Sequence, residues 1–326
     1  MTKSPDRGLP LVHARDRSAV PIDYRYVRRA LASETATRVA PGTYAQTQQW
    51  EKLKPIEQHL IRVREAMARS HGQLLLSHLA AAARWGIEIL GSWPRRVDTR
   101  VERAGGGRAS GLLQRHAWGV DGVDISEWEG HFVTSPAQTA IDLASVLSYT
   151  SAVIVIDQVL WERREGGALA TPDDIQRVMA ESAPRRGTRK VERAVAFATT
   201  LSDSVRESQS RVIIHELGFP DPILQHPIRL LDGRWAYPDF YFAEFDHAAE
   251  FDGVGKYLDP ELLRGRTSAQ ALVAEKDRAD ALARMVAKLS RWRTPALRDP
   301  RVLFDILVAA GLPTRKPRPS RGTVWQ

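Results

Sequence analysis

The spacing of hydrophobic residues predicts several helices in the N-terminal part of the chain. Within residues 55–69 apolar side chains recur every three or four positions, which places them on one face of a helix. The same pattern, preceded by a cap residue or followed by a glycine, predicts helices over 23–33 and 77–86. Residues 38–44 contain a Pro-Gly pair between extended stretches, which predicts two strands joined by a turn.

The middle of the chain changes from a helical to a strand-like pattern. Residues 97–133 contain short extended runs separated by glycine-rich turns, which is typical of strands. The motif Ser135-Pro-Ala-Gln138 then supplies a helix cap, a proline in the first turn and a glutamine at the third position, so a helix is predicted to begin there. The apolar run 152–160 is expected to be buried, and the Thr-Pro-Asp-Asp motif at 171–174 begins another helix.

The C-terminal third reads as a helix, three strands and a second helix. We predict the first helix over 204–217, extended segments over 223–231, 234–242 and 245–252, and a long helix over 268–289. This order predicts a mixed α/β unit with one face of an antiparallel sheet covered.

A chain of 326 residues is too long for one ordinary core, so we expect an α/β multidomain protein. The shifts in pattern divide it into a flexible arm at 1–20, a helix-and-hairpin region at 21–95, an α+β middle region at 96–165, a helical connection at 166–203, an α/β domain at 204–312 and a basic, disordered tail at 313–326.

The charge balance points to a polyanionic partner. The formal net charge is +8, and a basic surface attracts phosphate groups, so nucleic acid, with DNA preferred over RNA, is the expected partner; the alternative is a basic but inert surface. The chain has no cysteine, no signal-peptide pattern and no apolar run near the roughly 20 residues that a membrane helix needs. We therefore expect a cytoplasmic protein with no membrane partner.

Three carboxylates near the second and third predicted strands are the clearest chemical signal. Because side chains alternate along a strand, Asp239, Glu250 and Asp252 are expected to converge on one face of a hairpin. Like charges gathered in this way repel one another, and a divalent cation relieves the repulsion. Mg²⁺ or Mn²⁺ fits, since both prefer oxygen ligands, and such a site suits hydrolysis of phosphodiester bonds. Lys276, with Arg278 or Lys256, is the candidate cation beside the site.

These residues resemble the PD-(D/E)XK nuclease superfamily, and within it the small domains related to very-short-patch-repair endonucleases. The resemblance covers about residues 204–307 and rests on Pro238-Asp239 followed by Glu250-Phe-Asp252-Gly. It implies a restriction-endonuclease-like α/β domain in which Asp239, Glu250 and Asp252 bind the metal. It also implies that Glu207 is an auxiliary acid. The sequence departs from the family in that Asp252 occupies the position of the usual lysine.

The N-terminal region carries a cluster of arginines. Arg25, Arg28, Arg29 and Arg38 surround the first predicted helix and the hairpin, an arrangement typical of the end of a winged helix, where arginines contact phosphate. Residues 20–165 resemble the antitoxin-like region of the AbiEi type, from type IV toxin–antitoxin systems. The resemblance rests on three segments: 38–45, 76–83 and 134–143. It implies a winged-helix-like α+β region and a toxin partner.

Several of these residues also have a purely structural interpretation, whereas Glu250 is a carboxylate within an apolar strand and needs a partner. Glu207 completes a capping box with Ser204, and Asp252 precedes a glycine in a typical turn pair. Lys276 and the arginines of the first helix fit a solvated helix face equally well. Three functions therefore stay open, and the first two are a DNA-binding, metal-dependent endonuclease and a DNA-binding antitoxin-like regulator without catalysis. An interaction scaffold indifferent to DNA is the third.

Overall fold

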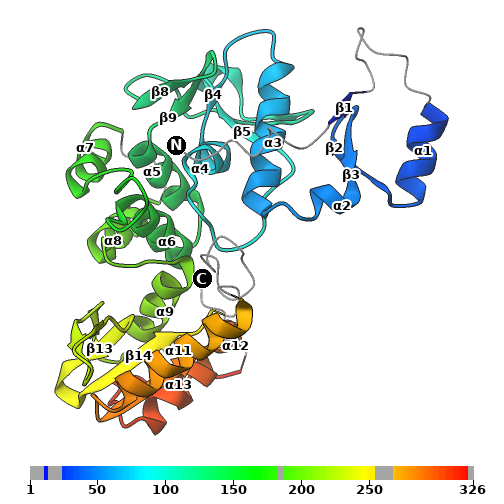
Figure 1. Ribbon diagram of the computed structural model, residues 1–326. Coiled ribbons are helices and arrows are strands. Elements are labelled where there is room, and N and C mark those ends of the chain that lie inside the picture. The colour runs from blue at the N-terminus through cyan, green and yellow to red at the C-terminus, as the bar shows by residue number, and fades with distance from the viewer. Residues whose placement is uncertain (1–10, 14–23, 183–186, 254–266, 322–326) are drawn as a thin grey trace. The chain divides into compact units, whose positions relative to one another are not determined.

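The structure is a computed structural model that describes residues 11–13, 24–182, 187–253 and 267–321. The chain divides into two compact units (Figure 1). The first comprises Met1–Leu160 and Arg164–Ala198, and the second comprises Trp161–Arg163 and Thr199–Gln326. Each unit combines helices and sheets, so the expected mixed α/β architecture is confirmed at this level. No helix in the described part of the chain is long and apolar enough to cross a membrane.

The first unit begins with a helix beside a small sheet. Helix α1 (Tyr24–Ala32) precedes an antiparallel hairpin of β2 (Ala36–Ala40) and β3 (Thr43–Gln46), as predicted from the Pro-Gly turn. Strand β1 (Val12–His13) pairs with β3 and gives the order β1-β3-β2. The prediction of a flexible arm over 1–20 is wrong at β1, because its backbone is hydrogen-bonded into this sheet; residues 1–10 and 14–20 lie outside the described part.

A six-stranded mixed sheet forms the centre of the first unit. Its order is β6-β7-β5-β4-β9-β8, with β4 parallel to β9 and β5 parallel to β7. The strands are β4 (Leu75–Leu76), β5 (Val97–Arg100), β6 (Ala109–Ser110), β7 (Leu113–His116), β8 (Ile125–Trp128) and β9 (His131–Thr134). Because β4 lies in the middle of this sheet, the predicted regions 21–95 and 96–165 share one folded unit.

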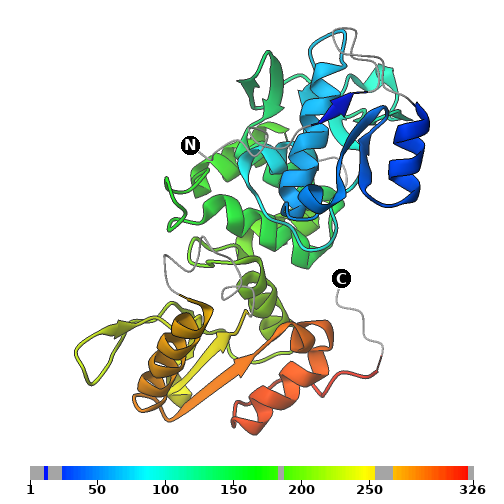
Figure 2. The same cartoon turned by 45° about the vertical axis from the view of Figure 1, so that its right-hand side comes forward.

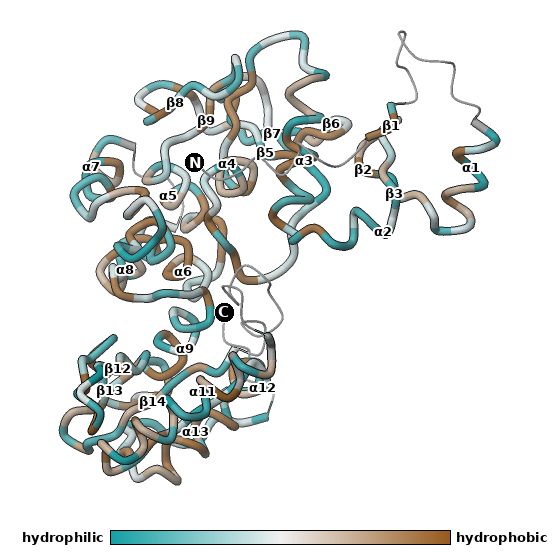
Figure 3. The backbone as a smooth tube through the Cα atoms, viewed as in Figure 1, coloured by the Kyte–Doolittle hydropathy of each residue, from teal (hydrophilic) through white to brown (hydrophobic). Residues whose placement is uncertain are grey.

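The other helices of the first unit lie before, within and after this sheet in the order of the chain. They are α2 (Thr47–Trp50), α3 (Pro55–Ala68), α4 (His78–Trp85), α5 (Pro136–Val146), α6 (Tyr149–Leu160), α7 (Pro172–Ser182) and α8 (Thr188–Phe197). In Figure 3 the hydrophobic colouring runs through α4 and α6, and both helices are largely buried. Helices α7 and α8 pack against α5 and α6, so most of the helical connection predicted at 166–203 belongs to this core.

The second unit is built on a four-stranded sheet of order β10-β13-β14-β15. Its first three strands are antiparallel, whereas β15 runs parallel to β14. The elements are α9 (Val205–Glu216), β10 (Ile223–Leu224), the hairpin β11 (Ile228–Arg229) and β12 (Trp235–Ala236), β13 (Phe240–Phe242), β14 (His247–Phe251), α11 (Ser268–Ala283), β15 (Lys288–Trp292), α12 (Thr294–Arg298) and α13 (Pro300–Ala309).

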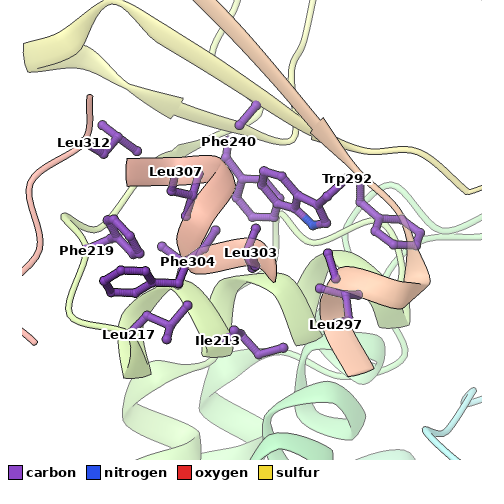
Figure 4. Packing of buried hydrophobic residues seen from close by; sticks show 14 of the residues in the cluster. Ile213, Leu217, Phe219, Phe240, Trp292, Leu297, Leu303, Phe304, Leu307 and Leu312 are labelled. Atoms are coloured by element: carbon purple, nitrogen blue, oxygen red, sulfur yellow. The ribbon is translucent and has the colours of Figure 1, made fainter. Parts of the chain in front are cut away.

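The two faces of this sheet pack against different helices. Phe240, Phe251 and Trp292 point to one face, where α9, α12 and α13 supply the rest of an apolar core (Figure 4). On the other face Ala248 and Leu289 pack against α11. Figure 2 shows α11 in orange and α13 in red-orange on opposite sides of the strands. Both faces are therefore covered, whereas the sequence predicted one covered face.

The strand predicted over 223–231 is split into β10 and β11, which belong to different sheets. Two further predicted elements of the second unit are wrong in extent. The helix predicted over 268–289 ends at Ala283, and the next regular element is β15. The single strand predicted over 234–242 is broken at Tyr237-Pro-Asp into β12 and β13. In both cases pairing with β14 decides the outcome, because β13 and β15 are the two neighbours of that strand.

The described part of the basic tail is held by hydrogen bonds, contrary to the prediction of disorder. The Thr314 hydroxyl donates to the carbonyl of Leu217 at 2.7 Å, and Lys316 Nζ donates to the carbonyl of Glu216 at 2.9 Å. These carbonyls at the end of α9 have no partner within their helix, so the tail satisfies them. Arg318 forms an ion pair with Asp305 on α13 at 2.7 Å.

Candidate functional site

The candidate site lies on the face of the C-terminal sheet that α11 covers. Glu250 is the fourth residue of β14, and Arg291 is its register partner on β15. Asp239 directly precedes β13, whose first residue pairs with the residue before Glu250. The alternation of strand side chains thus brings Asp239, Glu250 and Arg291 to one face, and α11 adds Glu275 and Arg278.

Glu250 is the buried centre of the site. Its side chain is 5% exposed, and Oε1 accepts a hydrogen bond from Arg278 Nη1 at 2.8 Å. Oε2 lies 3.3 Å from Arg291 Nε, but the geometry gives no hydrogen bond, so both atoms are buried without a hydrogen-bond partner in the described structure. A buried carboxylate oxygen in this state still has strong capacity to bind a donor or a cation.

Glu275 joins both arginines from the opposite side. It accepts hydrogen bonds from Arg278 Nη2 at 2.7 Å and Nε at 3.0 Å, and it also pairs with Arg291. Burial alone raises the pKa of Glu275, but the bonds to Arg278 and Arg291 prevail and lower it below its ordinary value. Burial lowers the pKa of Arg278, but its hydrogen bonds and ion pairs with Glu275 and Glu250 prevail and raise it. Glu250, Glu275, Arg278 and Arg291 are therefore a charge-balanced network.

Asp239 and Asp252 lie at the edge of this network with partners of their own. Asp239 Oδ2 accepts a hydrogen bond of 2.7 Å from the backbone N–H of Phe251, which ties the start of β13 to β14. Asp252 Oδ2 accepts from Arg293 Nε at 2.8 Å and Nη2 at 2.7 Å. Within the described residues no three His, Asp or Glu side chains form a group that could hold a metal ion.

Two other predicted catalytic residues stand apart from the network. Glu207 Oε1 accepts from the Ser204 hydroxyl at 2.8 Å and Oε2 from the backbone N–H of Asp203 at 2.9 Å, while Ser204 caps α9 by accepting from the Glu207 N–H. Glu207 is therefore bonded at the start of its own helix. Lys276 is exposed on α11. Lys256 lies outside the described residues.

The sequence missed the contribution of Arg291 and Arg293. Both lie at or directly after β15, the strand that the predicted long helix concealed. Their spacing of two residues was the available signal, because alternate residues of a strand share a face.

The N-terminal arginines are exposed, as nucleic-acid contacts require. Arg25, Arg28 and Arg29 lie on α1, and Arg38 lies on β2. Among the described residues, neither Arg28, Arg29 nor Arg38 forms an ion pair; Arg25 has a partner. Their charges are therefore largely available to phosphate.

Arg38 also borders a cavity of about 640 Å³ inside the first unit. Arg95 and Arg96, which the sequence did not single out, border the same cavity from the loop before β5. Asp98 on β5 and Gln114 on β7 are register partners and line it as well.

A buried polar cluster adjoins Asp98 on the same sheet. His116 Nε2 lies 2.8 Å from Asp98 Oδ1, and the His116 ring stacks on His78 with centroids 3.9 Å apart. His78 has a left-handed backbone with φ of 48°, and its Nε2 is buried without a partner among described residues. Burial, followed by His116 and Arg100, lowers the pKa of His78 well below its ordinary value. This burial is typical of a structural histidine.

Comparison with known proteins gives a partial match. No protein-family model matches the chain. Two Mycobacterium tuberculosis proteins, the uncharacterized protein MT2308 and the uncharacterized protein Rv2248, are each 29% identical over 147 residues. The match covers 45% of this chain and 52% of each relative, so the chain spans about half the length of the curated relatives that it matches.

Proposed function

We propose that the chain is a DNA-binding protein whose C-terminal unit is a metal-dependent endonuclease. The supporting observation is the placement of Asp239, directly before β13, beside Glu250 on the adjacent strand β14, on the sheet face beneath α11. The surrounding order is helix, antiparallel strands, helix and a parallel strand. This order and the two acids together resemble the PD-(D/E)XK core, a restriction-endonuclease-like fold.

In this proposal Asp239 and Glu250 hold Mg²⁺ or Mn²⁺. The fit rests on Glu250 Oε2, a buried carboxylate oxygen without a hydrogen-bond partner among the described residues. Asp252 Oδ2 accepts hydrogen bonds from Arg293, so Asp252 would bind the metal through Oδ1. When bound, the metal would activate a water molecule and stabilise charge on the phosphate.

Arg278 and Arg291 take the place of the missing family lysine. Both are arginines adjacent to Glu250, and a guanidinium stabilises the negative charge that develops on a phosphate during cleavage. Lys276 keeps a lesser role, as an exposed cation on the same helix.

The first unit supplies the DNA contacts. Arg25, Arg28, Arg29 and Arg38 present exposed cations on α1 and β2, beside a hairpin that we interpret as winged-helix-like. Phosphate contacts of this kind give affinity and orientation and do not by themselves select a DNA sequence.

One observation favours the second candidate, a non-catalytic, antitoxin-like DNA-binding regulator. Glu250 and Glu275 are already neutralised by Arg278 and Arg291, so the network is balanced without a metal. In this alternative the network is a structural ion-pair cluster, and a toxin would be the partner.

Cleavage of supercoiled plasmid with Mg²⁺ or Mn²⁺ separates the two functions. We expect Glu250→Gln and Asp239→Asn to lower the cleavage rate by about 100-fold or more, since even residues outside a metal's direct shell contribute about 10–100-fold. Asp305→Asn removes an exposed carboxylate of the same unit and should cleave as wild type.

Circular dichroism should first establish that all four proteins are folded. Retained DNA binding without cleavage by the wild type would favour the regulator. Equal cleavage by all four proteins would contradict the site.

A further inference from the structure

The cavity bordered by Arg38, Arg95 and Arg96 has the features of a ligand site. It lies within the first unit, and its volume of about 640 Å³ falls in the range of small-molecule pockets, about 300–1,000 Å³. It is lined by residues of the β2–β3 turn, the loop before β5 and the β6–β7 turn, and it is open to solvent.

The rim of the cavity is cationic. Arg38, Arg95 and Arg96 are all exposed, and no guanidinium group of the three forms an ion pair or hydrogen bond with another described residue. Guanidinium groups bind phosphate through paired hydrogen bonds, and three of them around one opening concentrate positive potential there. A phosphate group is therefore the anion that fits this rim best.

The floor of the cavity is polar and held in place. Asp98 is 7% exposed, with Oδ1 bonded to His116 Nε2 at 2.8 Å and Oδ2 accepting from the Leu79 N–H at 3.2 Å. Beside it, Gln114 offers both an amide donor and an acceptor. A fixed carboxylate accepts hydrogen bonds from ring N–H and amino groups, which are the groups on the polar edge of a nucleobase.

Further residues of the lining are apolar. Val39, Pro41, Pro94 and Leu112 line the cavity together with the arginines and Asp98. Apolar side chains contact the flat faces of any base, so this contact does not discriminate among the four bases. The lining thus offers cations for a phosphate, apolar side chains for the faces of a base, and hydrogen-bonding groups for its polar edge.

We propose that this cavity binds one nucleoside phosphate, with its phosphate at Arg38, Arg95 and Arg96 and its base edge at Asp98 and Gln114. The ligand is either a free nucleotide or an unpaired nucleotide of a DNA strand. The second source rests on the proposed DNA binding, whereas the first is independent of it.

Calorimetric titration without divalent metal tests the proposal. The probes are the four deoxynucleoside monophosphates and an unstructured single-stranded oligonucleotide, titrated into wild-type protein. We expect Arg95→Ala/Arg96→Ala and Arg38→Ala to weaken binding of the tightest probe by about 10-fold or more, because each loses charge-assisted hydrogen bonds. Arg189→Ala removes an exposed charge on α8, away from the cavity, and should bind as wild type.

A second variant tests the floor. Gln114→Leu keeps the size of the side chain but removes the amide, so it should change the preference among the four bases and leave the contribution of the arginines intact. Wild-type affinity in the arginine variants, or equal weakening by Arg189→Ala, would overturn the proposal, as would the absence of binding by every probe.

The same titrations distinguish a free nucleotide from a DNA strand as the ligand, and they test the nucleotide cavity separately from the proposed endonuclease site. Binding of a monophosphate as tightly as the oligonucleotide supports a free nucleotide, and binding of the oligonucleotide alone supports a strand. Because no metal is present, cleavage plays no part in the result. Nucleotide binding by a protein that fails to cleave plasmid would support the cavity and count against the endonuclease.

Discussion

His59 shows how burial of a single residue sets a pH dependence. It is fully buried on α3, where Nδ1 bonds to the carbonyl of Pro94 at 3.0 Å and Nε2 has no partner among the described residues. Burial outweighs the bond to Pro94 and the charge of Asp98, and it lowers the pKa of His59 from 6.5 to about 4. The imidazole of His59 is therefore neutral in the folded protein near neutral pH.

We predict that acid weakens the first unit through this residue. Between the folded pKa near 4 and the unfolded value of 6.5 the unfolded chain binds the extra proton, so stability falls as pH falls. The free energy of unfolding should drop by about 2 kcal/mol from pH 7 to about pH 5 on account of His59. Urea unfolding of wild type and His59→Leu at both pH values measures it.

The His59→Leu protein loses the bond to Pro94 and should be less stable than wild type at both pH values. Its free energy of unfolding should, however, decrease less between pH 7 and about pH 5 than that of wild type, by about 2 kcal/mol. An equal loss in both proteins would show that His59 does not titrate in this way.

Residue-scale patterns were predictable where one local group decides the outcome. Glu250 stood out because a carboxylate within an apolar strand needs a partner, and Arg278 supplies one. The stacking of His78 on His116 was not predictable, because the two residues lie far apart in the chain and only the pairing of β4, β5 and β7 brings them together.

At the scale of elements, the junction between α9 and the tail depends on Gly218. Its φ of 77° is the left-handed conformation that ends many helices. A Cβ at this position would lie 3.0 Å from Lys316 Cγ and 3.2 Å from the backbone N of Lys316. The space that glycine leaves is therefore occupied by the tail.

We predict that Gly218→Ala costs more stability than Gly233→Ala. Both glycines have positive φ, so both variants lose about 1 kcal/mol to backbone strain. Gly233 has open space at Cβ, whereas Gly218→Ala must also displace Lys316. Urea unfolding should show the larger loss for Gly218→Ala, together with faster amide exchange at Arg315, which donates to the Gly218 carbonyl. Equal losses, with unchanged exchange, would refute the docking of the tail.

Elements with local signals were predicted well, and elements defined by distant partners were not. Helix α5 begins where expected, because the Ser135 hydroxyl accepts a hydrogen bond from the N–H of Gln138, the last residue of the Ser-Pro-Ala-Gln motif. Strand β15 has no such signal: Leu289 faces α11 while Trp292 faces the other core, and this alternation has meaning only once β14 lies beside it. The position of Arg291 at the candidate site was hidden for the same reason.

At the scale of the whole molecule, the net charge of +8 should appear as salt-dependent DNA affinity. Each phosphate contact contributes about −0.9 to the slope of log K against log salt for duplex DNA. We predict that Arg28→Gln/Arg29→Gln makes the slope shallower by about 2, because two contacts are lost.

Arg189→Gln, which changes an exposed charge on α8, should leave the slope unchanged. Fluorescence anisotropy of a labelled duplex at several salt concentrations gives all three slopes. A slope near zero for the wild type would support an interaction scaffold and contradict DNA binding.

The central claim is that Asp239 and Glu250 form a divalent-metal site, and Mn²⁺ binding measured by electron paramagnetic resonance tests it most directly. The signal of free Mn²⁺ falls as the ion binds, so titration counts the sites without any need for cleavage. We predict one site in wild type and in Asp305→Asn, and its loss in Asp239→Asn/Glu250→Gln. Identical titrations of the wild type and the double variant would contradict the claim and leave the cluster as an arginine-balanced structural network.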